Sequence, residues 1–344
     1  MIQEIKIENY RCFKDFSLKD LKRVNLLVGK NNSGKTSIIE LLNILEKPFE
    51  LFPIGEILRR RGEFLDSKHE FLDLNNLYND YICQTNDVFS ICCKKNNSNY
   101  PYCFDGTIKA MPSADPHSMD EDIVLHCDWY KDSVGTGQMI TIGPKHSMLA
   151  KNFYNGLSRK HNSVYLPSTS FSIDEAVPLF EEMVLTDDET IVIEALQIIE
   201  PSIRKIGIID SGQNIAVRCE GSENRIRIDS FGEGISRLFA LIVALVNAKD
   251  GVLMVDEIDT GLHFSVMEDM WRLILKVAEK NNVQVFTTTH SNDCWQSLAS
   301  VTYDYSQYTK DNVSIQRIEK GKTKAVSFSE KEIIAAVNND IEVR

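Results

Sequence analysis

Eight residues from Gly29 to Thr36 have the types and the spacing needed to bind phosphate groups. They fit the pattern G-x-x-x-x-G-K-[ST], whose glycines let backbone N–H groups turn toward phosphate oxygens. Lys35 would bring a positive charge to the outer phosphates, and the Thr36 hydroxyl would be a ligand for Mg²⁺. A predicted strand at 24–28 precedes the pattern and a predicted helix follows it, which is the context that this loop requires. The alternative is a glycine turn that only caps the helix.

Acidic residues and a histidine follow two other apolar segments. Asp256 and Glu257 close the run 252–255, and His290 follows the run 283–289. The carboxyl ends of parallel strands are where open α/β sheets bind ligands. Asp256 is therefore predicted to hold Mg²⁺ and Glu257 to orient or deprotonate an attacking water, while His290 could donate to the terminal phosphate. The alternatives are a helix N-terminal charge for the acidic pair and a capping or core histidine.

A second glycine loop, Ser230–Gly234, precedes an apolar helix predicted from Ile235 to Ala248. Its amides and the Ser230 hydroxyl could form another anion site. One chain cannot easily aim two such loops at the same phosphate from opposite sides. A single subunit therefore does not explain why the sequence contains two loops of the phosphate-binding kind.

Length and composition limit the class of protein. A chain of 344 residues with 43% hydrophobic and 26% charged residues is expected to fold as one large discontinuous domain or as two lobes. The net charge of −12 repels phosphate backbones and anionic lipid, so contact with nucleic acid would need a local patch such as Arg59–Arg61. No window approaches about 18 apolar residues and no leader is evident. We expect a cytoplasmic protein that does not contact a membrane.

The eight cysteines are expected to be reduced thiols within strands, because disulfides are unusual in the cytoplasm. Five of them lie with His117 and His126 between residues 83 and 127. Their spacing matches no common zinc-ligand pattern, so a zinc site there is the less favoured alternative.

The order of apolar segments predicts an α/β fold. Strands alternate with helices in 1–46 and again from 164 to 344, which is typical of a mostly parallel sheet flanked by helices. Between 47 and 163, short strand-like pieces separated by Asn- and Ser-rich turns predict an antiparallel meander. The expected organisation is therefore a discontinuous domain, 1–46 and 164–344, with a β-rich and helical insertion over 47–163.

Taken together and in this order, these segments resemble the ABC-type ATPase heads, a group that includes SMC, RecF and overcoming-lysogenization-defect (OLD) proteins. Residues 5–13 resemble the first strands of such heads and 29–36 their Walker A motif. Residues 230–234 resemble the signature loop, 255–263 the Walker B motif with its D-loop, and 289–291 the switch histidine. The closest form is the AAA-15/AAA-21 group. The resemblance implies a P-loop NTPase fold with an ABC-ATPase-like head and an antiparallel β lobe.

The resemblance also implies a mechanism. Family members dimerise head to tail and hold two ATP molecules, each between Walker A of one subunit and the signature loop of the other, which accounts for the second glycine loop. It assigns metal binding to Thr36 and Asp256, and catalysis to Glu257, His290 and Lys35. The implied nucleotide contacts are Gly29, Asn31, Asn32, Ser33, Gly34, Lys35, Thr36 and Arg11, with Ser230, Gly232 and Gly234 acting on the nucleotide of the other subunit. A Q-loop glutamine cannot be placed, and Phe264 stands where relatives often have proline.

The same resemblance suggests a biological role. Only 54 residues (344 minus 290) follow His290, too few for the Toprim nuclease of many OLD proteins, and residues 47–163 lack the heptads of an SMC coiled coil. A head with a modest insertion resembles the ATPase components of two-gene phage-defence or toxin–antitoxin systems such as PARIS and Septu. We therefore expect an ATP-dependent switch that regulates a separate effector, such as a nuclease or toxin.

Two other functions compete with the switch. One is an SMC- or RecF-like DNA clamp in DNA repair, in which Arg59–Arg61 and Lys94–Lys95 would contact phosphates, although the overall acidity disfavours it. The other is a GTPase, based on the D-x-x-G pattern at Asp229–Gly232. Its only matching base-recognition pattern, Thr309–Asn312, follows no clear apolar strand.

Overall fold

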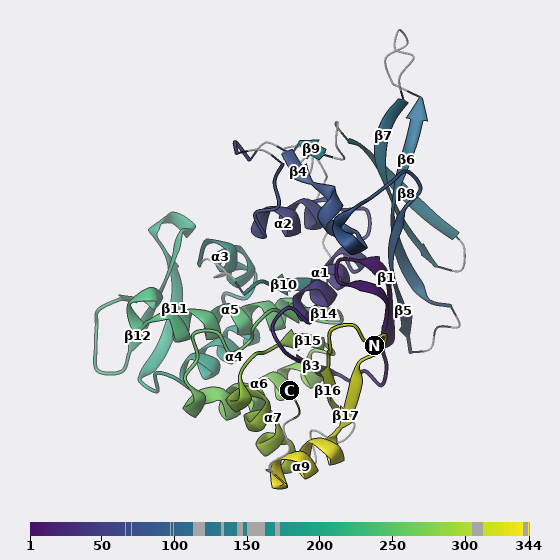
Figure 1. Cartoon of the computed structure of the whole chain (residues 1–344). Helices are drawn as coiled ribbons and strands as arrows, with labels where there is room; N and C mark the ends of the chain where they lie inside the picture. The colour runs from purple at the N-terminus through teal and green to yellow at the C-terminus, as the bar shows by residue number, and fades with distance from the viewer. Residues whose placement is uncertain are drawn as a thin grey trace. The chain divides into compact units, whose positions relative to one another are not determined.

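The computed structural model describes residues 1–65, 67–69, 71–96, 98, 100–112, 121–131, 134–142, 147–149, 162–168, 173–304, 312–339 and 343. The contacts within the chain divide it into two compact units. Figure 1 shows the helices and strands of the whole chain. The first unit comprises residues 1–21, 30–161 and 318–327, and the second comprises 22–29, 162–317 and 328–344. The chain passes from the second unit to the first at Gly29–Lys30, inside the phosphate-binding motif.

The second unit is built on the predicted parallel sheet. Its central strands are short, and β3, β14 and β15 are buried along their whole length, as expected for strands covered on both faces. Parallel pairing joins β10 to β14, β14 to β15, and β3 to both β15 and β16. The order in the sheet is β10 (Ser163–Leu166), β14 (Val252–Val255), β15 (Gln284–Thr288), β3 (Val24–Val28), β16 (Val313–Arg317) and β17 (Val326–Ser329).

The helices of the second unit bury their apolar faces on this sheet and on one another. α5 is buried at almost every position from Ile235 to Val246 because it contacts α3, α4 and α6 as well as β10 and β14. Thr186 caps α4, its hydroxyl accepting a hydrogen bond from the Asp188 N–H at 3.2 Å. The helices are α3 (Ile173–Glu181), α4 (Asp187–Leu196), α5 (Glu233–Asn247), α6 (Met267–Lys280), α7 (Asn292–Asp304) and α9 (Glu330–Asn338), with 3₁₀ turns η4 (Asp210–Gly212), η5 (Ile228–Phe231) and η6 (Phe264–Val266).

A small antiparallel sheet in the same unit contains a hairpin whose turn lies near residue 210. It consists of β11 (Ile203–Ile209), β12 (Asn214–Cys219) and β13 (Ile226–Arg227). The hairpin turn contains Ser211 and Asp210, both at positive φ. β13 is followed directly by η5 (Ile228–Phe231), which leads into the second glycine loop.

The first unit contains the predicted antiparallel meander, but the meander extends the sheet begun by the amino-terminal strands. β1 pairs with β5 from Ile2 to Glu8, a contact between segments about 85 residues apart. Residues 1–21 and 30–46 therefore group with the inserted strands, whereas the expected domain division placed them with the parallel sheet. The sheet order is β2 (Phe13–Leu18), β1 (Ile2–Tyr10), β5 (Val88–Lys95), β6 (Tyr102–Pro112), β7 (Glu121–Lys131) and β8 (Val134–Ile142).

The helix that follows the phosphate loop is enclosed within the first unit. α1 (Lys35–Leu45) buries ten of its eleven residues. Trp129 of β7 donates its indole N–H to the Ile44 carbonyl at 3.1 Å, and Lys95 of β5 pairs with Glu46 at 2.7 Å. The remaining elements of this unit are α2 (Phe52–Arg60), the strands β4 (Phe71–Asp73) and β9 (Ser147–Leu149), and the 3₁₀ turns η1 (Leu74–Leu77) and η2 (Asn79–Tyr81).

The cysteines differ in part from expectation. Cys92 and Cys103 are directly opposite each other on β5 and β6, with Cα atoms 4.1 Å apart, and they form a disulfide. The expectation that all eight are reduced is therefore wrong for this pair, because the strand register places the two side chains together. The other six are free thiols, and no cluster of metal-ligand side chains occurs among the described residues, from which His117 is missing. Within the same described part, no helix is long and apolar enough to cross a bilayer.

Candidate nucleotide site

The phosphate loop begins at Gly29, directly after β3, and its backbone is wound through conformations that suit few residues. Gly29, Asn32 and Gly34 have φ angles of 146°, 60° and 100°. A Cβ atom at Gly34 would lie 2.3 Å from the Phe13 ring and 2.6 Å from the Cys12 sulfur. Only glycine therefore fits at this position, because both the backbone conformation and the space exclude a side chain.

Polar groups of this loop fit a phosphate ligand. Lys35 is 3% exposed, and its ammonium donates to the Lys30 carbonyl at 3.1 Å, which places the charge over the loop. The Ser33 hydroxyl is buried without a hydrogen-bond partner among the described residues, so it is a donor suited to a phosphate oxygen. Helix α1 starts here with no acidic residue in its first turn and no side-chain cap within the described chain. Its positive end thus faces the loop without a competing carboxylate.

The acidic pair lies at the carboxyl end of β14, as predicted. Asp256 is 3% exposed, and its Oδ1 accepts a hydrogen bond from the Thr288 hydroxyl at 2.7 Å. The same hydroxyl accepts a hydrogen bond from the Glu257 N–H at 2.8 Å. Glu257 itself has a positive φ of 51°. Thr288 therefore links the end of β15 to both acidic residues.

The structure brings the predicted catalytic glutamate and histidine together. His290 Nε2 lies 3.7 Å from Glu257 Oε1, and both side chains are about two-fifths exposed. Thr260 donates its hydroxyl to Glu257 Oε2 at 3.3 Å. Gly29 directly follows β3, Asp256 directly follows β14, and His290 comes two residues after β15. These three strands are parallel neighbours, so the three residues lie at the carboxyl edge of the sheet, where ligands of such folds bind.

The second glycine loop packs against the turn that follows Glu257. Gly232, with φ of 97°, is the residue before α5, and Ser230 belongs to the 3₁₀ turn that leads to it. Ser230 and Gly232 are both exposed. A Cβ atom at Gly234 would lie 2.8 Å from the Gly261 carbonyl oxygen, so the start of α5 and the D-loop are in close contact. The loop is therefore accessible on one side and tied to the acidic turn on the other.

Three residues that sequence reasoning missed hold this arrangement. Thr260 and Thr288 bond the acidic pair as described, and Arg237 of α5 donates to main-chain oxygens of Pro167, Asp256 and Glu257. Burial lowers the pKa of Arg237, while the charges of Asp256 and Glu257 oppose that shift. The only signal in the sequence was a charged residue inside an otherwise apolar helix.

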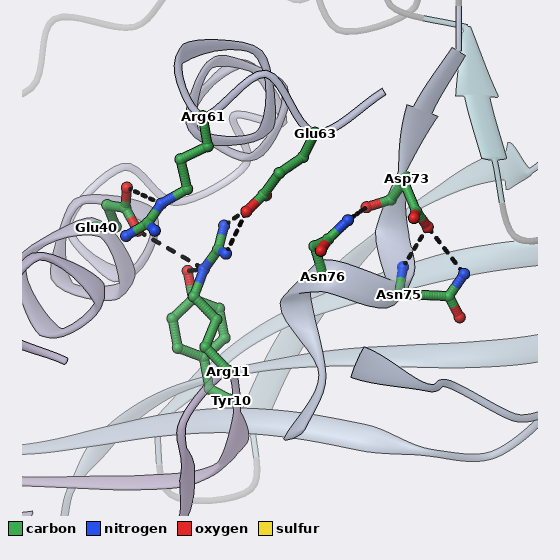
Figure 2. Close-up of polar contacts among 8 residues, drawn as sticks. All are labelled: Tyr10, Arg11, Glu40, Arg61, Glu63, Asp73, Asn75 and Asn76. Carbon is green, nitrogen blue, oxygen red and sulfur yellow. Dashed lines mark hydrogen bonds and ion pairs between the residues drawn. The ribbon is translucent and has the colours of Figure 1, made fainter. Parts of the chain in front are cut away.

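Arg11 has a different environment from the one the resemblance implies (Figure 2). Its guanidinium is 4% exposed and donates two hydrogen bonds to Glu63, at 2.7 and 2.9 Å, while Nε lies 3.7 Å from Glu40. Arg61 binds the same Glu40 through two nitrogens, at 2.8 and 2.9 Å. Burial opposes the charged form of Arg11, but Tyr10, Glu63 and Glu40 outweigh it and raise the pKa. Contact between Arg11 and nucleotide stays a prediction, and the observed contacts tie β1 to α1 and to residue 63.

A phosphate loop after one parallel strand, an acidic pair and a histidine after its neighbours, and a second glycine loop define a P-loop NTPase of the ABC-head type. The model of the AAA ATPase domain family, AAA_15, matches residues 1–155 and 144–294. The chain belongs to this family and is an ATPase.

Relatives and solved structures agree with this assignment. The chain is 22% identical over 350 residues to a Helicobacter pylori protein named ATP/GTP phosphatase, covering 90% of this chain and 91% of that one. A segment of 67 residues, 18% of this chain and 31% of the other, is 39% identical to an uncharacterized protein of Methanocaldococcus jannaschii.

Two solved structures share the fold. An SMC head bound to the C-winged helix domain of ScpA matches with a TM-score of 0.53 and 13% identity, over 95% of this chain and 98% of that one. A second SMC head, with an extended coiled coil and bound to the C-terminal domain of ScpA from Pyrococcus furiosus, gives a TM-score of 0.50 and 11% identity, over 99% of each chain. At such identities the likeness shows the fold alone, which is the P-loop NTPase fold predicted from the sequence.

Proposed function

We propose that the protein is an ATP-driven switch whose heads dimerise head to tail around ATP and control a separate effector protein, such as a nuclease or toxin in anti-phage defence. The observation that carries the proposal is the grouping of Glu257, His290 and Thr260 beside an accessible signature loop. A hydrolytic centre that packs directly against a loop for a second subunit suits an enzyme whose turnover is tied to dimerisation.

Each predicted residue has a defined task in this proposal. Residues Gly29 and Asn31 to Thr36 hold the phosphates, while Thr36 and Asp256 are the Mg²⁺ ligands. Bound Mg²⁺ supplies charge neutralisation at the phosphate oxygens. Carboxylate and hydroxyl oxygens are the donors that this ion prefers, and Asp256 is already oriented by the Thr288 hydroxyl.

Glu257 is the proposed general base. Its carboxylate orients a water and accepts the proton as the water attacks the terminal phosphorus. Thr260 holds one carboxylate oxygen, and His290 faces the other at 3.7 Å, so the carboxylate is restrained from both sides. His290 and Lys35 are assigned to stabilising the charge on the terminal phosphate.

The partners follow from the exposed surfaces and from the resemblance. Ser230 and Gly232 are accessible and lie where a second copy of the chain can reach them, which supports a head-to-tail dimer. The SMC heads in the two solved structures are bound to domains of ScpA. This supports the proposal that the present head also acts through a separate protein.

The test separates binding from hydrolysis. Lys35→Ala should abolish ATP binding, whereas Glu257→Gln should bind ATP, accumulate as a dimer and lose turnover by about 10²-fold or more. ATP hydrolysis, binding of a fluorescent ATP analogue and mass from light scattering measure these effects. Glu279→Gln, an exposed residue at the end of α6, is the matched control. Unchanged turnover in both site variants would refute the proposal.

The contacts of the basic residues bear on the two other functions. Arg59 and Arg60 pair with Glu56, Arg61 pairs with Glu40, and Lys95 pairs with Glu46, so most of the charges proposed for DNA already have acidic neighbours. For the GTPase alternative, a hydrogen bond from Arg227 lowers the pKa of Asp229, which fixes the pattern's aspartate in an ion pair. Thr309 to Asp311 lie outside the described residues. Salt-dependent DNA binding, or GTP outcompeting ATP, would favour these alternatives.

A further inference from the structure

One charged residue stands inside the most apolar helix of the second unit. Arg237 of α5 is 7% exposed. Its Nη1 donates to the Pro167 carbonyl at 3.0 Å, and its Nη2 donates to the carbonyls of Asp256 and Glu257 at 2.9 and 3.3 Å. The guanidinium thus bonds the main chain just after two neighbouring strands, β10 and β14.

Stability alone does not account for this residue. A buried charge is costly to remove from water, and buried polar groups commonly add less stability than well-packed apolar residues of similar volume. Ile235, Leu238 and Phe239 surround Arg237 in the sequence and are all buried without such a cost. An explanation for the buried arginine should therefore come from the main-chain groups that its guanidinium bonds.

The guanidinium holds a residue in an unfavourable backbone conformation. Glu257 has φ of 51°, a region that L-amino acids other than glycine, asparagine and aspartate seldom adopt. Such a conformation persists only where the surrounding structure imposes it. The Glu257 N–H is bonded by Thr288 and its carbonyl oxygen by Arg237. The peptide groups on both sides of Glu257 are therefore fixed.

We propose that Arg237 is a positioning residue for hydrolysis, which holds Glu257 in the conformation that directs its carboxylate to the attacking water. The inference rests on the proposed function, because it takes Glu257 as the general base. Arg237 lies about one helical turn after Gly234, so it also connects the signature loop to the base. Through Arg237, docking of the signature loop on a second subunit would therefore affect the alignment of Glu257.

The test uses the split between turnover and binding. Arg237→Gln should lower kcat by about 10- to 100-fold, because a displaced base loses its alignment, while the Kd for ATP stays within about twofold of the wild type. Arg272→Gln is the matched control, since Arg272 lies on α6 and pairs with Glu268 and Asp269 outside the site. Thermal unfolding of each variant verifies that it is folded.

A double-variant cycle distinguishes positioning from general structural damage. If Arg237 acts through Glu257, then Arg237→Gln in a Glu257→Gln background lowers single-turnover hydrolysis no further. Additive losses, weakened ATP binding or a wild-type kcat in Arg237→Gln would overturn the inference. If Arg237→Gln does not fold, Arg237→Lys decides by the same criteria, since a single ammonium cannot reproduce the guanidinium fork. Full ATPase activity in Glu257→Gln would instead refute the proposed function, because Glu257 would then not be the general base.

Discussion

At the scale of single residues, Gly34 defines the phosphate loop by lacking a side chain. Its φ of 100° and the 2.3 Å approach of the Phe13 ring both exclude alanine. We predict that Gly34→Ala lowers affinity for ATP at least about tenfold, measured with a fluorescent ATP analogue. Gly62→Ala is the control, because Gly62 also has a positive φ but nothing lies within 4 Å of the place that a Cβ atom would take. It should cost about 1 kcal/mol of stability and leave ATP affinity unchanged; equal losses in both variants would contradict the prediction.

Sequence alone pointed to residues whose own chemistry is distinctive, and did not point to those whose contacts come from distant parts of the chain. Lys35, Asp256 and Glu257 were predicted as site residues because of their places in sequence motifs, and their roles stay predictions. Arg237 bonds a carbonyl 70 residues away in the chain, and no local pattern reports such a contact. Arg11 carries the opposite lesson. The resemblance implied a nucleotide contact for this residue, which stays a prediction, and it gave no sign of the two carboxylates that the fold places beside the guanidinium.

At the scale of elements, α1 is held by a network of four charged residues (Figure 2). Glu40 of α1 lies between Arg11 and Arg61, and its side chain is 5% exposed. Replacement by glutamine would remove this carboxylate from the buried Arg11 guanidinium and from Arg61, whose side chain is about one-third exposed. Because a buried charge would lose one of its partners, Glu40→Gln should lower the free energy of unfolding by about 3 kcal/mol.

Urea denaturation measures this loss, and Glu56→Gln is its control. Glu56 pairs with Arg59 and Arg60 on α2 but is partly exposed, and such pairs contribute only about 0.3–0.5 kcal/mol. Similar losses in the two variants would show that the Glu40 network does not stabilise α1. Because Arg61 directly follows α2 in the inserted segment, the same network joins that segment to the phosphate-loop helix.

The elements themselves were predictable where the pattern is local. Alternating apolar strands and helices gave the parallel sheet, and the Asn- and Ser-rich turns gave the meander. The pairing of β1 with β5 was not predictable, because antiparallel partners distant in sequence carry no local signal of their register. The Cys92–Cys103 bond was missed for the same reason, since it depends on the register of β5 against β6.

At the scale of the whole molecule, net charge separates the two leading functions. Each chain carries −12, so two heads that meet around ATP repel each other, whereas a DNA clamp must attract a polyanion through local basic residues. Salt weakens both the repulsion between heads and the attraction to DNA, so rising salt should strengthen the dimer and weaken DNA binding. We predict that the ATP-bound dimer of Glu257→Gln tightens as NaCl rises from about 50 to about 300 mM, because screening weakens the repulsion.

The dimer dissociation constant, from light scattering over a dilution series with saturating Mg²⁺ and ATP, measures this effect. Lys35→Ala under the same conditions is the control, since it should stay monomeric at every salt concentration. A dimer that weakens steeply with salt would show that attraction between opposite charges dominates the interface, contrary to the argument from net charge. DNA affinity that falls with the slope of a multi-phosphate contact, in the same samples, would move the assignment from a protein-controlling switch to a DNA clamp.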